Sequence, residues 1–284
     1  MDLRDSEEEN ADGPRADAAD ADDAAVDQPI RADLPEPADS PEAFVESVAE
    51  RLETDPEAAG DAVGDLLAIA HDHEGAPRVA AGEALDALGR RHPRAFEVWT
   101  DVLADAAGDA DDEVAFFATR ALAQLAARNP RAAAKGLKPA LGNLGAPSAD
   151  LRQAALSVVA EVGPEEPDAV GRADRPLAAA LHDEHAGVRT AAAIAAGRLL
   201  AAAPAKFPRT ATALVQAVDD EDDRVRQYVL LSLANFAGEH PSNVPEKQRA
   251  ISALASVDDD ELGLRRGATG EALSELVSLT FEEE

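Results

Sequence analysis

Residues 183–189 have the sequence Asp-Glu-His-Ala-Gly-Val-Arg, and the pattern within them, an Asp followed five residues later by Val or Leu and then by Arg, recurs along the chain. It returns at Asp220, which precedes Val225-Arg226, and at Asp259, which precedes Leu264-Arg265. A polar turn followed by an apolar position and a fixed Arg is typical of a repeated structural unit.

Three partial copies lie upstream of the complete ones. Asp109 precedes Val114-Ala115, Ala146 precedes Leu151-Arg152, and Asp72 precedes Pro77-Arg78. The apolar position of the pattern therefore falls at 77, 114, 151, 188, 225 and 264. The first five of these anchor positions follow one another at one constant interval, and the last interval is slightly longer, so the sequence predicts about six repeats.

The residues around each anchor also repeat. Small or large apolar residues stand at fixed offsets after it, which trace one face of a helix, and another stands before the Asp. Prolines separate the units, and no alternating apolar pattern indicates a strand. Each unit is thus predicted to contain two helices, A before the Asp and B after it. The positions after the anchor are Ala81, Leu85 and Leu88; Ala118, Leu122 and Leu125; Ala155, Val159 and Val162; Ala192, Ala196 and Leu199; and Val229, Leu233 and Phe236.

Over about residues 56–280 the chain resembles the HEAT-repeat family, through its Asp-x4-Val-Arg turns. The resemblance implies an all-α, right-handed α-solenoid of about six HEAT-type helix pairs, related to armadillo proteins. It also implies that the Asp and Arg residues form a structural ladder between neighbouring repeats, which should be weakened where Ala115 and Ala146 replace Arg and Asp. The implied ladder residues are Asp72, Asp109, Asp183, Asp220, Asp259, Arg78, Arg152, Arg189, Arg226 and Arg265.

The two ends of the chain differ from the repeats. Residues 1–40 carry many acids, three Arg and few large apolar residues, a composition typical of a disordered acidic arm. Its simplest role is solubility, and a role as a binding tail is a second interpretation. Ser40-Pro41 has the form of a helix N-cap, so an N-terminal capping helix should open a solenoid spanning residues 41–280, with an acidic tail at 281–284.

Composition limits the partners and the setting. The formal net charge of −31 opposes binding to nucleic acid or to an anionic membrane, and no apolar run is long enough for membrane insertion. Excess acid with scarce Lys favours a halophilic, archaeal protein, because carboxylates stay hydrated in concentrated salt. No Cys is present, which excludes disulfides and thiolate chemistry, and we expect a cytoplasmic location.

Two His-rich turns are the main candidates for chemistry, His71-Asp72-His73-Glu74 and His182-Asp183-Glu184-His185. One HEAT-like group, the deoxyhypusine hydroxylases, binds two irons with four His-Glu dipeptides. This chain has one such dipeptide, His73-Glu74, and the second turn lies three repeats away, so we interpret both as solvated turns. No residue supports the pigment attachment of the phycobilin-lyase group, and no phosphate loop is present. We therefore predict no catalytic residues, no metal site and no cofactor.

The outward side of the B helices is the predicted binding surface, because solenoids bind partners along their concave face. We expect a non-catalytic scaffold or adaptor that holds another protein, as a helix or an extended peptide, in the groove. A HEAT-like metal-dependent enzyme or enzyme subunit, and a regulatory subunit of a signalling or transport assembly, are the alternatives. The predicted surface residues are Phe116, Arg120, Gln124, Gln153, Ser157, Thr190, Arg198, Gln227, Tyr228 and Asn235.

Overall fold

The computed structural model describes residues 41–55, 60–257, 259–264 and 267–282. All regular elements in these ranges are helices, which confirms the predicted all-α fold. The acidic arm, Arg265 and the last two residues of the predicted tail lie outside the described residues.

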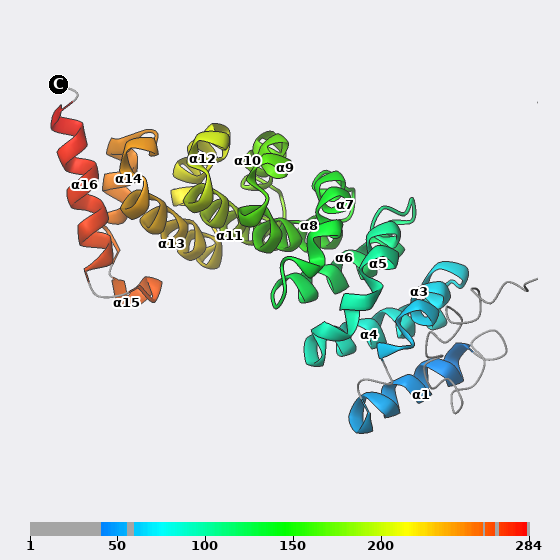
Figure 1. The fold of residues 1–284 in the computed structure, drawn as a ribbon. Helices are drawn as coiled ribbons and strands as arrows, with labels where there is room; N and C mark the ends of the chain where they lie inside the picture. Colours follow the sequence, from blue (N-terminus) through cyan, green and yellow to red (C-terminus); the bar gives the residue numbers. More distant parts are fainter. Residues whose placement is uncertain (1–40, 56–59, 258, 265–266, 283–284) are drawn as a thin grey trace, which may run out of the picture.

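The helices form antiparallel pairs stacked side by side, which makes the molecule an α-solenoid (Figure 1). We number the pairs repeats 1 to 6 and call the first helix of each A and the second B. The A helices are α3 (Val63–Asp72), α5 (Thr100–Ala106), α7 (Leu137–Asn143), α10 (Asp174–Ala180), α12 (Pro208–Gln216) and α14 (Lys247–Leu254). The B helices are α4 (Ala76–Arg91), α6 (Asp112–Ala126), α8 (Ala149–Val162), α11 (Ala186–Ala202), α13 (Asp223–Glu239) and α16 (Ala268–Glu282).

Shorter elements complete the stack. α1 (Pro41–Thr54) packs against α4 and opens the stack. α9 (Pro167–Val170) and α15 (Asp259–Leu262) are single turns in the connections. The 3₁₀ helices are η1 (Pro93–Trp99), η2 (Ala132–Gly136), η3 (Gly163–Glu165), η4 (Gly171–Ala173), η5 (Pro204–Lys206), η6 (Ala217–Asp219) and η7 (Pro241–Asn243).

Local sequence explains where several B helices begin. The side chain of Asp222 accepts hydrogen bonds from the backbone N–H groups of Arg224 and Val225 at 2.9 and 3.1 Å, so it caps α13. Asp111 caps α6 in the same way, and Ser148 caps α8. Such caps satisfy N–H groups that have no partner inside the helix.

The repeating apolar positions form one continuous core. The residues four, eight and eleven positions after the anchors in repeats 1 to 5 are all buried, and most are fully so. Because Ala occupies many of them, neighbouring B helices approach closely and bury apolar stripes that no single pair covers alone. This is the arrangement that the sequence pattern predicts.

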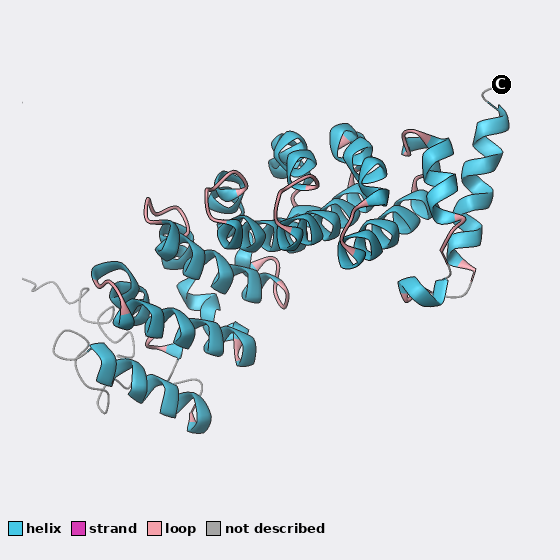
Figure 2. Cartoon of the chain, turned by 180° about the vertical axis from the view of Figure 1, so that it is seen from behind, coloured by secondary structure: helices cyan, strands magenta, loops and turns pink. Residues whose placement is uncertain are grey.

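The two kinds of helix lie on opposite sides of the stack. Figure 1 shows the A helices α5, α7, α10 and α12 along the outer side of the curved stack and the B helices along the inner side, and Figure 2 shows the same from behind. The row of B helices changes direction near α6. There, a Cβ atom at Gly82 or Gly89 of α4 would overlap the side chains of Phe117 or Gln124 of α6, so glycine is required for this close approach.

Candidate functional site

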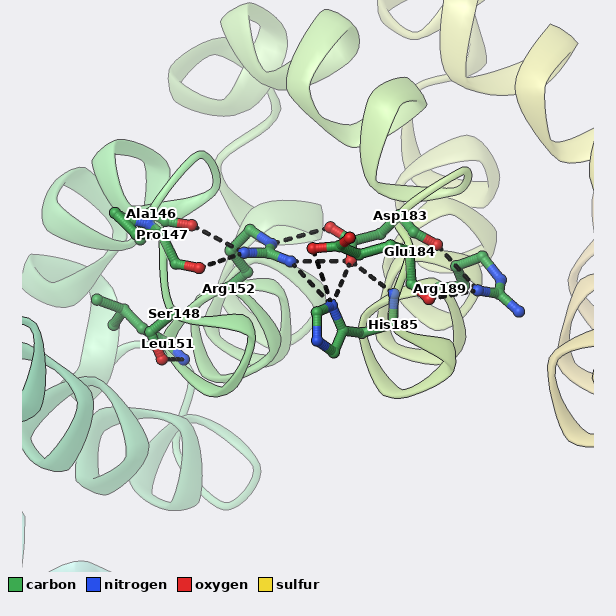
Figure 3. Close-up of polar contacts among 9 residues, drawn as sticks. All are labelled: Ala146, Pro147, Ser148, Leu151, Arg152, Asp183, Glu184, His185 and Arg189. Carbon is green, nitrogen blue, oxygen red and sulfur yellow. Dashed lines mark hydrogen bonds and ion pairs between the residues drawn. The ribbon is translucent and has the colours of Figure 1, made fainter.

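The turn between repeats 3 and 4 contains a bidentate ion pair (Figure 3). Arg152 Nε and Nη2 donate to Asp183 Oδ2 and Oδ1, both at 2.9 Å. Arg152 Nη1 also donates to the carbonyl oxygens of Ala146 and Pro147 at 2.9 Å, while Asp183 Oδ1 accepts the His185 N–H. The Arg of one repeat thus joins its own turn to the turn of the next repeat.

The same contacts recur one repeat later. Arg189 Nε and Nη2 donate to Asp220 Oδ2 and Oδ1 at 2.7 and 2.9 Å, and Nη1 donates to the Asp183 carbonyl oxygen at 2.9 Å. Asp220 Oδ1 accepts the Asp222 N–H at 2.9 Å. We call each such Arg–Asp link between consecutive turns a rung. Each side chain of this rung is about one-tenth exposed, so bulk water screens the pair only partly.

Electrostatics in the two rungs favours the charged forms. Burial raises the pKa of Asp220, but the hydrogen bonds from Arg189 and from the Asp222 N–H outweigh it, so the pKa lies below its ordinary value. The pKa of Asp183 is lowered by the same balance between burial and its bonds to Arg152 and the His185 N–H. Both carboxylates are therefore stabilised as partners of an Arg.

The link between repeats 1 and 2 has a different register. Arg78 Nη1 contacts Asp111 Oδ2 at 2.9 Å and Glu113 Oε2 at 3.1 Å rather than Asp109. Asp109 instead accepts the Asp111 N–H and lies 3.4 Å from His71 Nδ1. Arg78 therefore binds the residue that caps α6, and the pKa of Asp111 is lowered by its backbone hydrogen bonds and by Arg78.

The remaining predicted ladder residues do not form such links among the described residues. Between repeats 2 and 3 no rung exists, because the positions hold Ala115 and Ala146; Asn143 Nδ2 there donates to the Ala107 carbonyl oxygen at 2.8 Å. Arg226 donates to the Asp220 carbonyl oxygen and pairs with Asp223. Asp72 is exposed, and the side chain of Asp259 is outside the described part.

Four residues of the predicted binding surface, together with Ile194, meet in one groove. A cavity of about 320 Å³ lies between α8 and α11, and its walls include Gln153, Ser157, Thr190, Ile194 and Arg198. Gln153 and Arg198 are exposed, and the other three are half-buried. Arg198 also pairs with Glu161 across the groove, so the groove mixes amide, hydroxyl, apolar and charged groups.

The predicted residues on α6 belong to a separate cluster. Arg120 Nε contacts Asp86 Oδ1 of α4 at 2.6 Å, and Gln124 Nε2 contacts the same oxygen at 2.7 Å. The Arg120 guanidinium lies 5.7 Å from the centre of the Phe116 ring, which packs against Phe117. These side chains are half-buried and engaged with α4, whereas Gln227 and Asn235 on α13 are exposed and Tyr228 packs against the core.

The His-rich turns hold their side chains apart. His71 contacts Asp109, and His185 lies 3.4 Å from Asp183 Oδ1. Within the described ranges, no three His, Asp or Glu side chains are arranged to bind a metal ion. In the same ranges, no helix has the length and apolarity needed to cross a membrane.

One repeated core position was missed in the sequence. Nineteen residues after the anchors stand Phe96, Ala133, Val170, Phe207 and Val244, all buried beneath the connection that follows each B helix. The prolines of these connections indicate helix breaks, and they do not by themselves indicate buried positions. The constant distance of these apolar residues from the anchor is the signal that they belong to the core. The contact between Arg78 and Asp111, in contrast, gave no signal, because it breaks the repeat register.

The geometry defines an armadillo-like and HEAT-like α-solenoid. No protein-family model matches the sequence, and no curated protein does either. Solved structures do resemble it. A designed armadillo repeat protein superposes with a TM-score of 0.61 at 18% identity, covering 75% of this chain and 99% of the designed chain.

Two further structures give the same result. A designed armadillo repeat protein in complex with the peptide (KR)4 superposes with a TM-score of 0.60 at 18% identity, over 75% of this chain and 99% of that one. A computationally designed armadillo protein for modular peptide recognition gives 0.59 at 20% identity, over 75% of this chain and 99% of the other. At these identities the likeness establishes the solenoid fold.

Proposed function

We propose that the protein is a non-catalytic scaffold that holds an extended peptide segment of a partner protein along the inner, B-helix side of the solenoid. The observation that carries the proposal is the groove between α8 and α11, where the outward positions of two consecutive B helices line one cavity. A groove built from equivalent positions of successive repeats is suited to a partner that runs along the stack.

The chemistry of this surface favours a peptide backbone over a small substrate. Gln153 and Asn235 are exposed carboxamides on α8 and α13, and each can both donate to and accept from a peptide group. Ile194 offers an apolar contact between them, and Arg198 offers a charged one. The designed neighbours, named for peptide recognition or solved with a peptide, support the same choice.

The background charge favours a partner segment with basic residues. The chain carries 57 acids against 26 Lys and Arg, so a positively charged peptide gains attraction at long range. The composition also supports a setting of concentrated salt in the cytoplasm, where this attraction is screened and short-range contacts in the groove carry more of the affinity.

Site-specific photo-crosslinking in the native cell tests the proposal. A photoreactive amino acid is placed in the groove, at Ser157 or Thr190, and at a position of similar, intermediate exposure on an A helix, Thr212 of α12. We expect a discrete adduct with one protein from both groove positions and none from Thr212. Equal adducts from all three positions, or adducts from Thr212 alone, would contradict the groove as the binding site.

A further inference from the structure

A second cavity, of about 740 Å³, has a charge opposite to that of the chain. It lies between the start of α3, the end of α4, η1 and the end of α6. Its walls include Arg90, Arg91, His92, Arg94 and Arg128, and Asp61 is the one acid among the described residues that line it. We call it the basic cavity.

The positive charge of the basic cavity is largely unmatched. Arg91, Arg94 and Arg128 are exposed and form no ion pair with any residue in the described ranges, while Arg90 pairs with Asp86. At two later connections a cation is paired, Arg131 with Glu165 and Lys206 with Asp168. In a chain with a formal net charge of −31, three adjacent unpaired Arg residues indicate an anionic occupant.

The rim of the cavity adds an apolar contact. Val98 is 85% exposed, the most exposed large apolar side chain among the described residues. It stands next to Trp99, whose indole N–H donates to the Gly60 carbonyl oxygen at 3.0 Å. An occupant that combines negative charge with branched apolar side chains would satisfy both features, which a simple inorganic anion does not.

The chain itself contains a segment of this composition. Residues 1–40 carry 14 acids by count of the sequence against Arg4, Arg15 and Arg31. Between positions 20 and 34 the apolar residues Val26, Ile30 and Leu34 alternate with clustered Asp residues. The charge and the apolar spacing of this stretch complement the basic cavity.

The tether is long enough for this contact. The 14 residues of α1 span about 21 Å, and Gly60 at the wall of the cavity follows shortly after the end of α1. The ten residues between Ile30 and Pro41 can extend over roughly 36 Å. Because the segment is attached to the same chain, its effective concentration at the cavity is about millimolar.

We propose that residues 20–34 of the acidic arm dock intramolecularly in the basic cavity, with their carboxylates on Arg91, Arg94 and Arg128 and an apolar side chain on Val98. The docked segment covers the N-terminal end of the solenoid. The same Arg residues then neutralise part of the arm's charge, in contacts that concentrated salt weakens but does not abolish where water is excluded.

Energy transfer within the full chain tests the docking. The protein contains one Trp, Trp99 beside the cavity, and no Cys, so the substitution Ala18→Cys creates a single attachment point for a dansyl acceptor. We expect efficient transfer from Trp99 at the lowest KCl concentration that preserves the helical circular dichroism. Transfer should fall to the level of urea-unfolded protein in the variant Arg91→Gln/Arg94→Gln/Arg128→Gln.

A matched variant controls for overall charge. Arg172→Gln/Arg175→Gln/Arg209→Gln removes three exposed Arg residues far along the stack and should retain full transfer. Equal transfer in the two triple variants, or none in the parent, would overturn the proposal. Transfer that rises with protein concentration would also overturn it, because the occupant would then be the arm of a second copy. Loss of transfer on adding millimolar inorganic phosphate at constant ionic strength would support the docking, because the anion would displace the carboxylates of the arm from the same Arg residues.

Discussion

Some consecutive repeats are joined by a rung and others are not, and the comparison separates the role of the Arg–Asp pairs from that of the apolar core. The turns of repeats 3, 4 and 5 have rungs, and the turn between repeats 2 and 3 has none. Rungs link Arg152 to Asp183 and Arg189 to Asp220, whereas Ala115 and Ala146 leave the earlier turn without one. Yet α6 packs along α8 as extensively as α8 packs along α11. The apolar stripes therefore stack the helices, and the rungs fix the polar turns that lie at one edge of the stack.

The turn between repeats 1 and 2 is intermediate between these cases. Arg78 still joins consecutive turns, but through Asp111, the cap of α6. The row of B helices changes direction near α6 (Figure 1), which is also where the regular rung is absent. The comparison suggests measurements that separate the contribution of a rung from that of the core.

Removal of a complete rung should cause the largest change in the free energy of unfolding. Arg189→Ala leaves the partly buried Asp220 carboxylate without its Arg partner and removes the donor to the carbonyl oxygens of Asp183 and Glu184. We expect the free energy of unfolding to fall by about 3 kcal/mol, because a charge that has lost its partner in a partly buried site is costly. Urea unfolding followed by circular dichroism measures this change.

The matched control is Arg131→Ala, which removes an exposed pair with Glu165 on the opposite edge. Since exposed ion pairs add little, the urea midpoint should stay within experimental scatter. Similar losses in the two variants would mean that the rung is no stronger than a surface pair.

Introduction of a rung between repeats 2 and 3, where none exists, should change the free energy of unfolding by an intermediate amount. Arg189 of repeat 4 reaches the Asp of repeat 5, so Ala115→Arg in repeat 2 should reach Ala146→Asp in repeat 3. We expect each single change to be neutral or destabilising and the pair to show a coupling energy of about 1 kcal/mol in a double-mutant cycle. The pair Ala115→Arg with Ala146→Asn is the control, and a coupling equal to that of the control would show that this turn cannot form a rung.

The acid dependence of stability should give the smallest effect. The pKa of Asp220 is lowered in the folded protein, so its contribution is present above the unfolded pKa of about 3.9 and is lost as pH falls below it. The free energy of unfolding should therefore fall from about pH 5 to pH 3, and less steeply in Asp220→Asn. Asp150→Asn, at an exposed position, should keep the parental slope; the same slope in all three proteins would contradict a role for the rung.

The sequence predicted the parts of the structure that repeat and not the parts that break the repeat. Anchors such as Val188 and the positions that follow them are buried as expected, because a constant offset along a helix places them on one face. The Arg–Asp pairs were implied by resemblance, but the sequence does not show that each Arg reaches forward to the next repeat. Arg78 departs from the pattern, since it pairs with Asp111 and Glu113 rather than with Asp109, and nothing in its own turn sequence predicts that change of partner.

The positions of the proposed surface residues follow from the sequence only in part. Helical offsets alone place Gln153 and Thr190 on neighbouring B helices, and both line the groove between α8 and α11. The cluster around Phe116 did not follow from offsets, because it depends on Gly82 and Gly89 letting α4 approach α6. A contact that depends on the distance between two helices cannot be predicted from the residue pattern of either helix alone.

Each Arg of a rung pairs with the Asp of the following repeat. The segment from one such Asp to the residue before the next one therefore carries everything needed to join to an identical segment. Residues 183–219 begin with the Asp that receives Arg152 and contain Arg189, which reaches the Asp immediately after them. A tandem duplicate of this stretch would present a second Asp183 where Asp220 now stands, with the same buried faces on both sides. The turn chemistry therefore allows the solenoid to lengthen by gene duplication without a new kind of joint, and chains of this type are free to diversify in length while their inner surface changes one module at a time.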